Sequence, residues 1–542
     1  MNKTNLCALI IAVLIFSGDP CSPSSAQRPD SEPYRVIFNC DGHSVFGAAN
    51  GDHGAWIQNI FGPLEGSHVD ALFWCDGAGG NTANYDSDVL ELNGARIGAV
   101  NPILLRWIEQ GNDPPRSVVQ EGHKRGLDVY YSFRMNDIHD GYLPQEFATF
   151  KKEHPEWILG KGEIDTSQGR HAIKAKDPDE VYFSEYATSL NFAVPEVREL
   201  KLRIIQEIFD KYDFDGLEID LMRFPRYFAA YLEFRSAYIL TDFLRVVRQR
   251  LNERAEQRGR PIKLAVRVDE NLVACQLDGF DVATWVNESL VDSLIIGDSA
   301  FSRGQDIQAF KKLVEGKPVH VYACNGCIQQ SFRNSQGETP EVRRGLAANF
   351  WQQGADGIYT FNWFPHEPKL AYQTDLLKEI GDPRVLAIKD KTFSADCSEY
   401  GPEAKHTHPS SPRMHNWRFA PLPVTLHPVW SANSFTEIDV DVADDLSGVN
   451  REKVKSVQLW LQLSNLVPND VIEFRFNGQP LSPLPKSETG QESENERLVK
   501  FSLATHQLQV GRNRVGVRLS SRGATAETDI VFSTAEIHVD YD

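Results

Sequence analysis

Apolar and polar residues change their spacing along the chain in a way that predicts alternating helices and strands. From Val197 to Tyr212, apolar residues recur every three to four positions, which is typical of an amphipathic helix. From Gly216 to Met222 the period becomes two, so one face is apolar and the other carries Glu218 and Asp220. A strand with carboxylates on its inner face is typical of a (β/α)8 barrel, whose active sites lie at the C-terminal ends of the strands.

Strand-like segments recur from Tyr34 to about Lys389, with helical segments between them. The predicted strands are Arg35–Cys40, Val69–Cys75, Asp128–Arg134, Gly216–Met222, Ile262–Val268, Ser293–Ile296, Val319–Ala323 and Gly357–Phe361. Eight βα repeats favour a closed barrel over an open doubly wound sheet. Residues 33–390 are therefore predicted to form an α/β-class (β/α)8 TIM barrel. No GxGxxG follows a strand, which argues against a dinucleotide-binding fold.

The pattern changes after the barrel. Residues 391–423 are predicted to form a linker, because the composition shifts there to Pro, His, Ser and Gly. Residues 424–542 return to a period of two in short segments, such as Thr436–Val442 and Val471–Phe476, the latter followed by an Asn-Gly turn. This pattern predicts a C-terminal antiparallel β-sandwich that serves as an accessory domain.

The N-terminus and the net charge indicate where the protein works and what it binds. Lys3 precedes an apolar run and then small and polar residues up to Ala26, so residues 1–26 are predicted to be a signal peptide of a secreted or periplasmic protein. No later segment is predicted to span a membrane. The net charge of −19 argues against nucleic acids and anionic membrane surfaces as partners. Neither HExxH nor a Gly-x-Ser-x-Gly elbow occurs, and no cofactor or metal is predicted.

Polar residues gather near the C-terminal ends of the other predicted strands. Arg134 and Asn136 share the inner face of the third strand, and Asp137 and His139 follow on the loop. Later strands and the loops after them add Arg267, Asp269, Asp298, Asn325 and Trp363. Burial of such groups is unfavourable unless they are paired or serve a function. They are predicted to form the site, with a charge-paired structural layer as the alternative; Trp363 is expected either to support a sugar ring or to pack the rim.

Two carboxylates flanking a glycosidic bond are what sugar hydrolysis requires. Asp220 is the predicted catalytic carboxylate, with Asp269 or Asp298 as its partner, and Glu218 lies one pleat deeper. Glu218 is expected either to raise the pKa of Asp220 or to be held ionised, together with Asp220, by nearby arginines. We expect Asp220→Asn to remove turnover and leave folding largely intact, unless Asp220 neutralises a buried arginine.

Several motifs resemble the bacterial secreted proteins called glycosyl-hydrolase-like family 10, within the wider glycosidase superfamily. The matching segments cover most of the barrel: YYSFRMNDIHD (130–140), KKEHPEWILG (151–160), YDFDGLEIDLMRFPRYF (212–228), LAVRVDENL (264–272) and GFDVATWVNESLVDSLIIGD (279–298). The resemblance implies an active cleft at the ends of the third and fourth strands. The residues implied there are Arg134, Asn136, Asp137, His139, Glu218, Asp220 and Arg223.

The segment DGLEID is also similar to the DGxDxDxE motif of chitinases, in which the last acid protonates the glycosidic oxygen. Met222 occupies that position here, so the chitinase mechanism is not predicted.

The leading hypothesis is an exported glycoside hydrolase acting on a poly- or oligosaccharide. Its predicted substrate-binding residues are Arg134, Asn136, Asp137, His139, Arg223, Arg267, Asn325 and Trp363. A second hypothesis is a barrel that binds glycans without catalysis. A third is a lyase for acidic sugars, with His139 as the base and the arginines neutralising a uronate.

Overall fold

The structure is a computed structural model. It describes residues 32–42, 49–141, 143–160, 188–229, 231–297, 304–326, 339–397, 420–427, 434–447, 452–485 and 496–542. The predicted signal peptide lies outside these ranges, as do Asp298 and most of the predicted linker.

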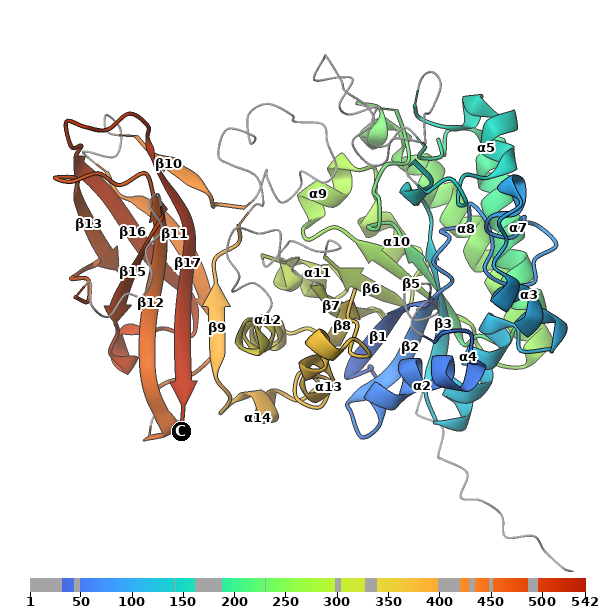
Figure 1. Cartoon of the computed structure of the whole chain (residues 1–542), viewed down its shortest axis with the longest axis horizontal. Helices are drawn as coiled ribbons and strands as arrows, with labels where there is room; N and C mark the ends of the chain where they lie inside the picture. Colours follow the sequence, from blue (N-terminus) through green and yellow to red (C-terminus); the bar gives the residue numbers. More distant parts are fainter. Residues whose placement is uncertain are drawn as a thin grey trace, which may run out of the picture. The chain divides into compact units, whose positions relative to one another are not determined.

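Eight parallel strands form a closed barrel in which each strand pairs with the next along the chain and β8 pairs with β1 (Figure 1). The strands are β1 (Val36–Asp41), β2 (Val69–Cys75), β3 (Asp128–Arg134), β4 (Gly216–Asp220), β5 (Lys263–Val268), β6 (Ser293–Ile296), β7 (His320–Gly326) and β8 (Gly357–Phe361). The predicted TIM barrel is therefore confirmed. The strand limits agree with the predicted ones to within two residues except in β7, which continues to Gly326 rather than ending at Ala323. β4 ends at Asp220 rather than Met222.

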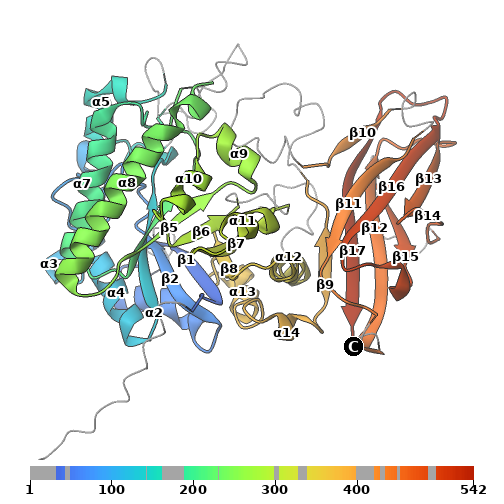
Figure 2. The same ribbon diagram turned by 180° about the vertical axis from the view of Figure 1, so that it is seen from behind.

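Helices follow the strands and lie outside them, as α7 and α8 show in both views (Figure 1, Figure 2). They are α2 (His53–Phe61), α3 (Pro102–Glu109), α4 (Pro114–Lys124), α5 (Thr149–Glu153), α7 (Pro195–Lys211), α8 (Glu233–Arg258), α9 (Leu272–Leu277), α10 (Val282–Asn287), α11 (Ile307–Leu313), α12 (Pro340–Gln352), α13 (Tyr372–Leu376) and α14 (Pro383–Leu386). Local sequence explains where they start. In α3, Asn101 Oδ1 accepts a hydrogen bond from the Ile103 N–H (2.9 Å), and Pro102 occupies the first turn, where its missing N–H costs nothing.

The barrel wall separates an apolar interior from an apolar helix layer. Leu217 and Ile219 of β4 are buried in the cluster that includes the helices. The interior has its own apolar layer: Ile37, Ala71, Phe73, Tyr130, Ala265, Ile295, Tyr322, Cys324, Tyr359 and Phe361. Glu218 and Asp220 alternate with Leu217 and Ile219, as the period of two predicts. The apolar layer forms a floor below the charged residues near the strand ends.

Gly216 provides the space for one ring of this floor. It lies opposite Tyr130 in the β3–β4 register, and a Cβ at residue 216 would lie 2.2 Å from Tyr130 Cε1. We expect Gly216→Ala to lower the free energy of unfolding by about 1–3 kcal/mol, because the ring must move within a filled interior. Urea denaturation measures this. Gly141→Ala is the matched control, since its Cβ would meet nothing closer than 3.7 Å; equal losses in both variants would contradict the explanation.

Two antiparallel sheets follow the barrel, consistent with the predicted β-sandwich. One has the order β10-β17-β12-β15, with β9 also paired to β17, and the other has the order β11-β16-β13-β14. The strands are β9 (Lys391–Ser394), β10 (Val424–Leu426), β11 (Thr436–Val442), β12 (Val454–Ser464), β13 (Val471–Phe476), β14 (Gln479–Leu481), β15 (Glu496–Ser502), β16 (Gly511–Ser521) and β17 (Ile530–Tyr541). In β12, buried Leu459 and Leu461 alternate with partly exposed residues. This is the period of two that the sequence predicted.

β9 is a strand that the sequence analysis did not predict. It lies within the predicted linker and pairs antiparallel with β17, with Phe393 opposite Ile537. Phe393 is buried. The barrel and sandwich boundaries at residues 390 and 424 stay predictions.

Two further sequence features have structural counterparts. Cys40, the last residue but one of β1, and Cys75, the last residue of β2, are both buried free thiols. Among the described residues, none of the helices combines the length and the apolar composition that a membrane span requires.

Candidate active site at the barrel mouth

Three charged residues of alternating sign occupy neighbouring positions on three strands. Arg134 of β3 is in register with Asp220 of β4, and Asp220 is in register with Arg267 of β5. All three are at most 3% exposed. They lie at the C-terminal ends of their strands, where barrel enzymes have their active sites.

The Asp220 carboxylate is held by two backbone N–H groups and one arginine. Its Oδ1 accepts hydrogen bonds from the backbone N–H groups of Met222 (2.9 Å) and Arg223 (3.0 Å). Its Oδ2 lies 3.3 Å from Arg267 Nη1. The Arg267 guanidinium also lies 3.8 Å from the centre of the Phe361 ring. Of the three arginines considered from sequence, Arg267 is therefore the one whose side chain pairs with Asp220.

Glu218 lies one pleat deeper and is fully buried. Its Oε2 accepts a hydrogen bond from the Tyr359 hydroxyl (3.1 Å), and Asn39 Nδ2 lies 3.5 Å away. Burial, and next the charge of Asp220, raise the pKa of Glu218 to about 7. Repulsion between the two acids therefore contributes to the raised pKa of Glu218.

Arg134 connects β1 to the loop after β3. Its Nη2 binds Asp41 Oδ2 at 2.9 Å, and its Nη1 lies 3.8 Å from Asp137 Oδ2. Its carboxylate partners are therefore Asp41 and Asp137.

Asp137, His139 and Arg223 form a connected group on the loops after β3 and β4. His139 Nδ1 lies 2.5 Å from Asp137 Oδ1, and Arg223 Nη2 lies 3.0 Å from His139 Nε2. Burial raises the pKa of Asp137, but the charges of His139, Arg134 and Arg223 outweigh it and hold the pKa well below its usual value. Asp137 is therefore an ionised carboxylate, and these predicted residues do lie together.

Glu146 is an acid that the sequence analysis missed. It is 3% exposed and lies on the loop that follows β3. Burial, followed by the negative charges of Asp137 and Asp140, raises its pKa to about 9. Glu146 is therefore protonated at neutral pH. The only available sequence signal was an acid on a βα loop, a position common to many surface residues.

The raised pKa of Glu146 predicts how stability depends on pH. The folded protein keeps this proton up to about pH 9, whereas the unfolded chain releases it near the ordinary value of 4.5. The contribution to stability is complete below pH 4.5 and is lost as pH rises toward 9. We therefore expect Glu146→Gln to gain stability relative to wild type between pH 5 and about 9. Guanidinium unfolding of both proteins at several pH values measures the difference, and a difference independent of pH would contradict the prediction.

Among the described residues, Asp137, His139 and Glu146 form a group with the geometry to hold a metal ion. Each offers one ligand-type atom, and the three atoms lie within 4.8 Å of one another. However, Arg134 and Arg223 already place positive charge beside Asp137 and His139. These positive charges favour an ionised Asp137 beside a protonated Glu146 over a bound divalent cation.

The remaining predicted site residues make hydrogen bonds to other groups of the protein. Asn136 Oδ1 accepts from the Leu190 N–H (3.0 Å), so its side chain ties two loops together. Asp269 is buried and its Oδ1 accepts from the Glu270 N–H (3.0 Å). Asn325 exchanges hydrogen bonds with Arg343, and the Trp363 indole donates to the Asn325 carbonyl (2.8 Å).

Trp363 is 2% exposed, with the Arg343 guanidinium 5.5 Å from its ring centre. Its contacts are those of a residue that packs the rim. Trp363 and Asn325 form a group with Arg343, whereas the ion pairs around Asp137 and Asp220 involve other side chains.

Comparisons with known proteins identify structural neighbours and no family. No family model matches the chain, and no curated protein matches it. An alpha-L-fucosidase isoenzyme from Paenibacillus thiaminolyticus is similar over 67% of this chain and 51% of its own, with a TM-score of 0.38 and 14% identity. The PgaB (BpsB) glycoside hydrolase domain from Bordetella bronchiseptica is similar over 64% of this chain and 99% of its own, with a TM-score of 0.39 and 10% identity.

A family 36 alpha-galactosidase from Geobacillus stearothermophilus, in complex with raffinose, is similar over 94% of this chain and 56% of its own, with a TM-score of 0.32 and 9% identity. The chain thus spans about half the length of the fucosidase and of the galactosidase. All three neighbours are glycoside hydrolases.

Proposed function

We propose that this protein is an exported glycoside hydrolase that cleaves a poly- or oligosaccharide at the C-terminal end of its barrel. One observation carries the proposal: buried carboxyl groups with opposite protonation states gather at that end. Glu146 keeps its proton at neutral pH, whereas Asp137 loses it and Asp220 contacts Arg267. Environments that push the pKa values of neighbouring acids apart are what acid-base catalysis on sugars requires.

In this proposal Asp220 supplies the negative carboxylate. It either attacks the anomeric carbon or activates the water that does so. Arg267 and two backbone N–H groups contact its carboxylate and hold it in position. Its position at the end of β4 supports this role.

Glu146 supplies the proton for the leaving oxygen. Its raised pKa keeps a proton available at neutral pH, and its loop follows β3 at the same end of the barrel. We place Glu146 ahead of Asp269, whose carboxylate accepts a hydrogen bond from its own chain neighbour. Arg134, His139 and Arg223 orient the acids and the sugar hydroxyls. The relationship to glycosyl-hydrolase-like family 10 is part of the same proposal.

A glycan-binding barrel without catalysis is the second candidate. It is favoured by the extent of internal pairing, in which Asp41 binds Arg134 and Asp220 binds Arg267. A screen of neutral, N-acetylated, de-N-acetylated and uronate-containing polysaccharides separates the two. New reducing ends from one class, absent with Asp220→Asn, support hydrolysis. Binding of a glycan by wild type without any new reducing ends supports the second candidate.

A further inference from the structure

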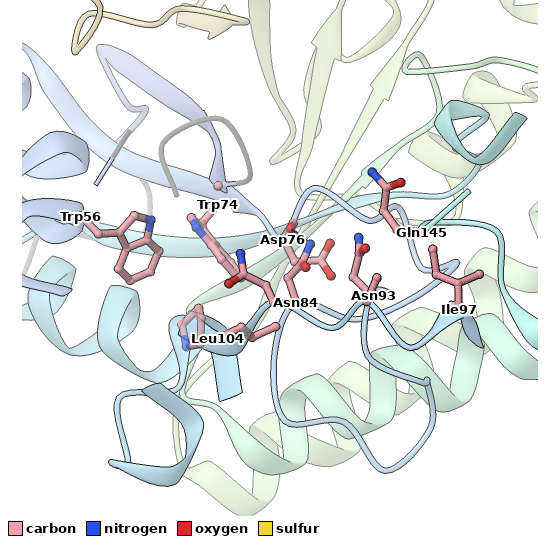
Figure 3. A pocket seen from close by; sticks show the side chains of 12 residues that line it. Trp56, Trp74, Asp76, Asn84, Asn93, Ile97, Leu104 and Gln145 are labelled. Carbon is pink, nitrogen blue, oxygen red and sulfur yellow. Dashed lines mark hydrogen bonds between the residues drawn. The ribbon is translucent and has the colours of Figure 1, made fainter. Parts of the chain in front are cut away.

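A cavity of about 340 Å³ lies beside the barrel, on the helix side of β2. Trp74 of β2 forms one wall, on the strand face opposite Phe73, which belongs to the barrel interior. Trp56 of α2, Leu104 of α3 and residues of the loop between β2 and α3 form most of the rest, and Gly42, Pro114 and Gln145 complete the lining (Figure 3). The volume falls within the range of about 300–1,000 Å³ typical of small-molecule sites.

The cavity has a buried floor and an open rim. Trp56, Trp74 and Asp76 are each at most 2% exposed, whereas Ile97 at the rim is 47% exposed. Gly42 allows the chain to pass close to the floor, because a Cβ there would lie 2.6 Å from Trp74 Nε1. The cavity is therefore open to solvent at its rim and closed at its floor.

Buried polar atoms around this cavity lack hydrogen-bond partners. Within the part of the chain that the structure describes, these atoms are Trp56 Nε1, Trp74 Nε1, Asn93 Nδ2 and Asp76 Oδ2. Four other indoles of the described residues are paired, in Trp285, Trp351, Trp363 and Trp460; the N–H of Trp285 donates to Thr241 Oγ1 at 2.9 Å. Because an unpaired buried polar group is unfavourable, several of them around one open cavity indicate a ligand that completes them.

Asp76 is positioned to accept hydrogen bonds from such a ligand. Its Oδ1 accepts from the Ala78 N–H (3.2 Å), which leaves Oδ2 for the cavity. Burial raises the pKa of Asp76 to about 6, with Arg134 opposing the shift and Asp137 adding to it. At neutral pH the carboxylate is therefore mostly an acceptor for hydroxyl groups.

The chemistry of the lining defines the ligand class. Two indole rings offer apolar faces for the C–H face of a sugar ring, while the indole N–H groups and Asn93 donate to hydroxyl oxygens. The lining includes one carboxylate, and neither lysine nor arginine is among its residues. We propose that this cavity binds the ring of an uncharged pyranose, at a site separate from the one where we place bond cleavage.

Fluorine NMR of protein labelled with 5-fluorotryptophan tests this directly. The chain has ten tryptophans, and Trp56→Phe and Trp74→Phe assign the two signals of the cavity. The probes are glucose, galactose, N-acetylglucosamine and glucuronate, each added up to about 100 mM, which detects weak binding. We expect at least one neutral sugar to shift both signals in a saturable way, and glucuronate to bind at least about tenfold more weakly because of Asp76.

Variants separate the cavity from its surroundings. Trp74→Phe keeps the ring but removes the donor, and should weaken binding of the same sugar about fivefold to tenfold. Trp285→Phe removes a paired indole N–H outside the cavity and is the matched control, with unchanged affinity expected. Asn93→Ala removes a donor nearer the rim. It replaces Trp74→Phe in the binding experiment if that variant does not fold.

Two results would overturn the proposal: no saturable shift with any neutral sugar, or glucuronate binding as tightly as the neutral sugars. The titration is repeated with Asp220→Asn, in which affinity should be unchanged. Because this readout needs no turnover, sugar binding without hydrolysis would count against the proposed hydrolase and not against the cavity. Hydrolysis of a glycan without sugar binding in this cavity would count against the cavity proposal and not against the proposed hydrolase.

Discussion

Asp220→Asn should reduce turnover of the cleaved glycan by about three orders of magnitude or more, because the carboxylate acts chiefly in the transition state. The same change should lower the free energy of unfolding by about 3–5 kcal/mol, because it leaves the buried Arg267 guanidinium without its carboxylate. The sequence alone led us to expect largely intact folding; the contact with Arg267 changes that expectation. Reducing-end assays and denaturant unfolding of the same preparation measure both effects.

A double variant separates the two roles of Asp220. In Asp220→Asn/Arg267→Met the unpaired charge is gone, so stability should return toward that of wild type. Activity should not return, because the carboxylate is still missing. Recovery of turnover in the double variant, or near-normal turnover in Asp220→Asn, would show that Asp220 is a structural ion-pair partner and not a catalyst.

Glu146→Gln should lower kcat on the natural glycan by about 10²–10⁴-fold, because an amide cannot donate a proton to the leaving oxygen. The loss should be much smaller on an aryl glycoside whose leaving group departs without protonation. The high-pH limb of the rate profile, which reports release of the Glu146 proton, should disappear in the variant. Steady-state kinetics on both substrates across pH measures these effects.

Glu156→Gln is the matched control for this experiment, because Glu156 is an exposed acid ten residues further along the chain. It should leave the kinetics unchanged. If Glu146→Gln retains full activity while Asp269→Asn loses it, the proton donor is Asp269, one of the two partners that the sequence predicted for Asp220.

The barrel could be predicted because its signal is local. In β4, consecutive residues alternate between apolar Leu217 and Ile219 and acidic Glu218 and Asp220. The apolar residues must face the buried helix layer, which fixes the direction of the acids. The same alternation predicted that Arg134 and Arg267 face the inside of the barrel, and the structure adds that both are in register with Asp220. β9 was not predicted because its segment is short and mostly polar. It forms a strand by pairing with β17, which is distant in sequence.

The ionic partners at the site could not be predicted in the same way. The alternation of side chains along a strand indicates that an arginine faces the inside of the barrel. It does not indicate which acid the arginine will pair with. Arg134 binds Asp41, 93 positions away, and that pairing depends on how the barrel closes. The pKa of Glu146 depends on burial and on two other acids, so a loop sequence carries no sign of it.

The pairing of β9 with β17 has a consequence for dividing this protein into parts. A fragment beginning at Val424 would lack β9, and the β17 residues that face it, Glu536 to Val539, would have unpaired backbone groups at a sheet edge. Such an edge invites association with other chains. A fragment that begins before Lys391 retains its own strand, and should stay monomeric in gel filtration at concentrations where the shorter fragment aggregates.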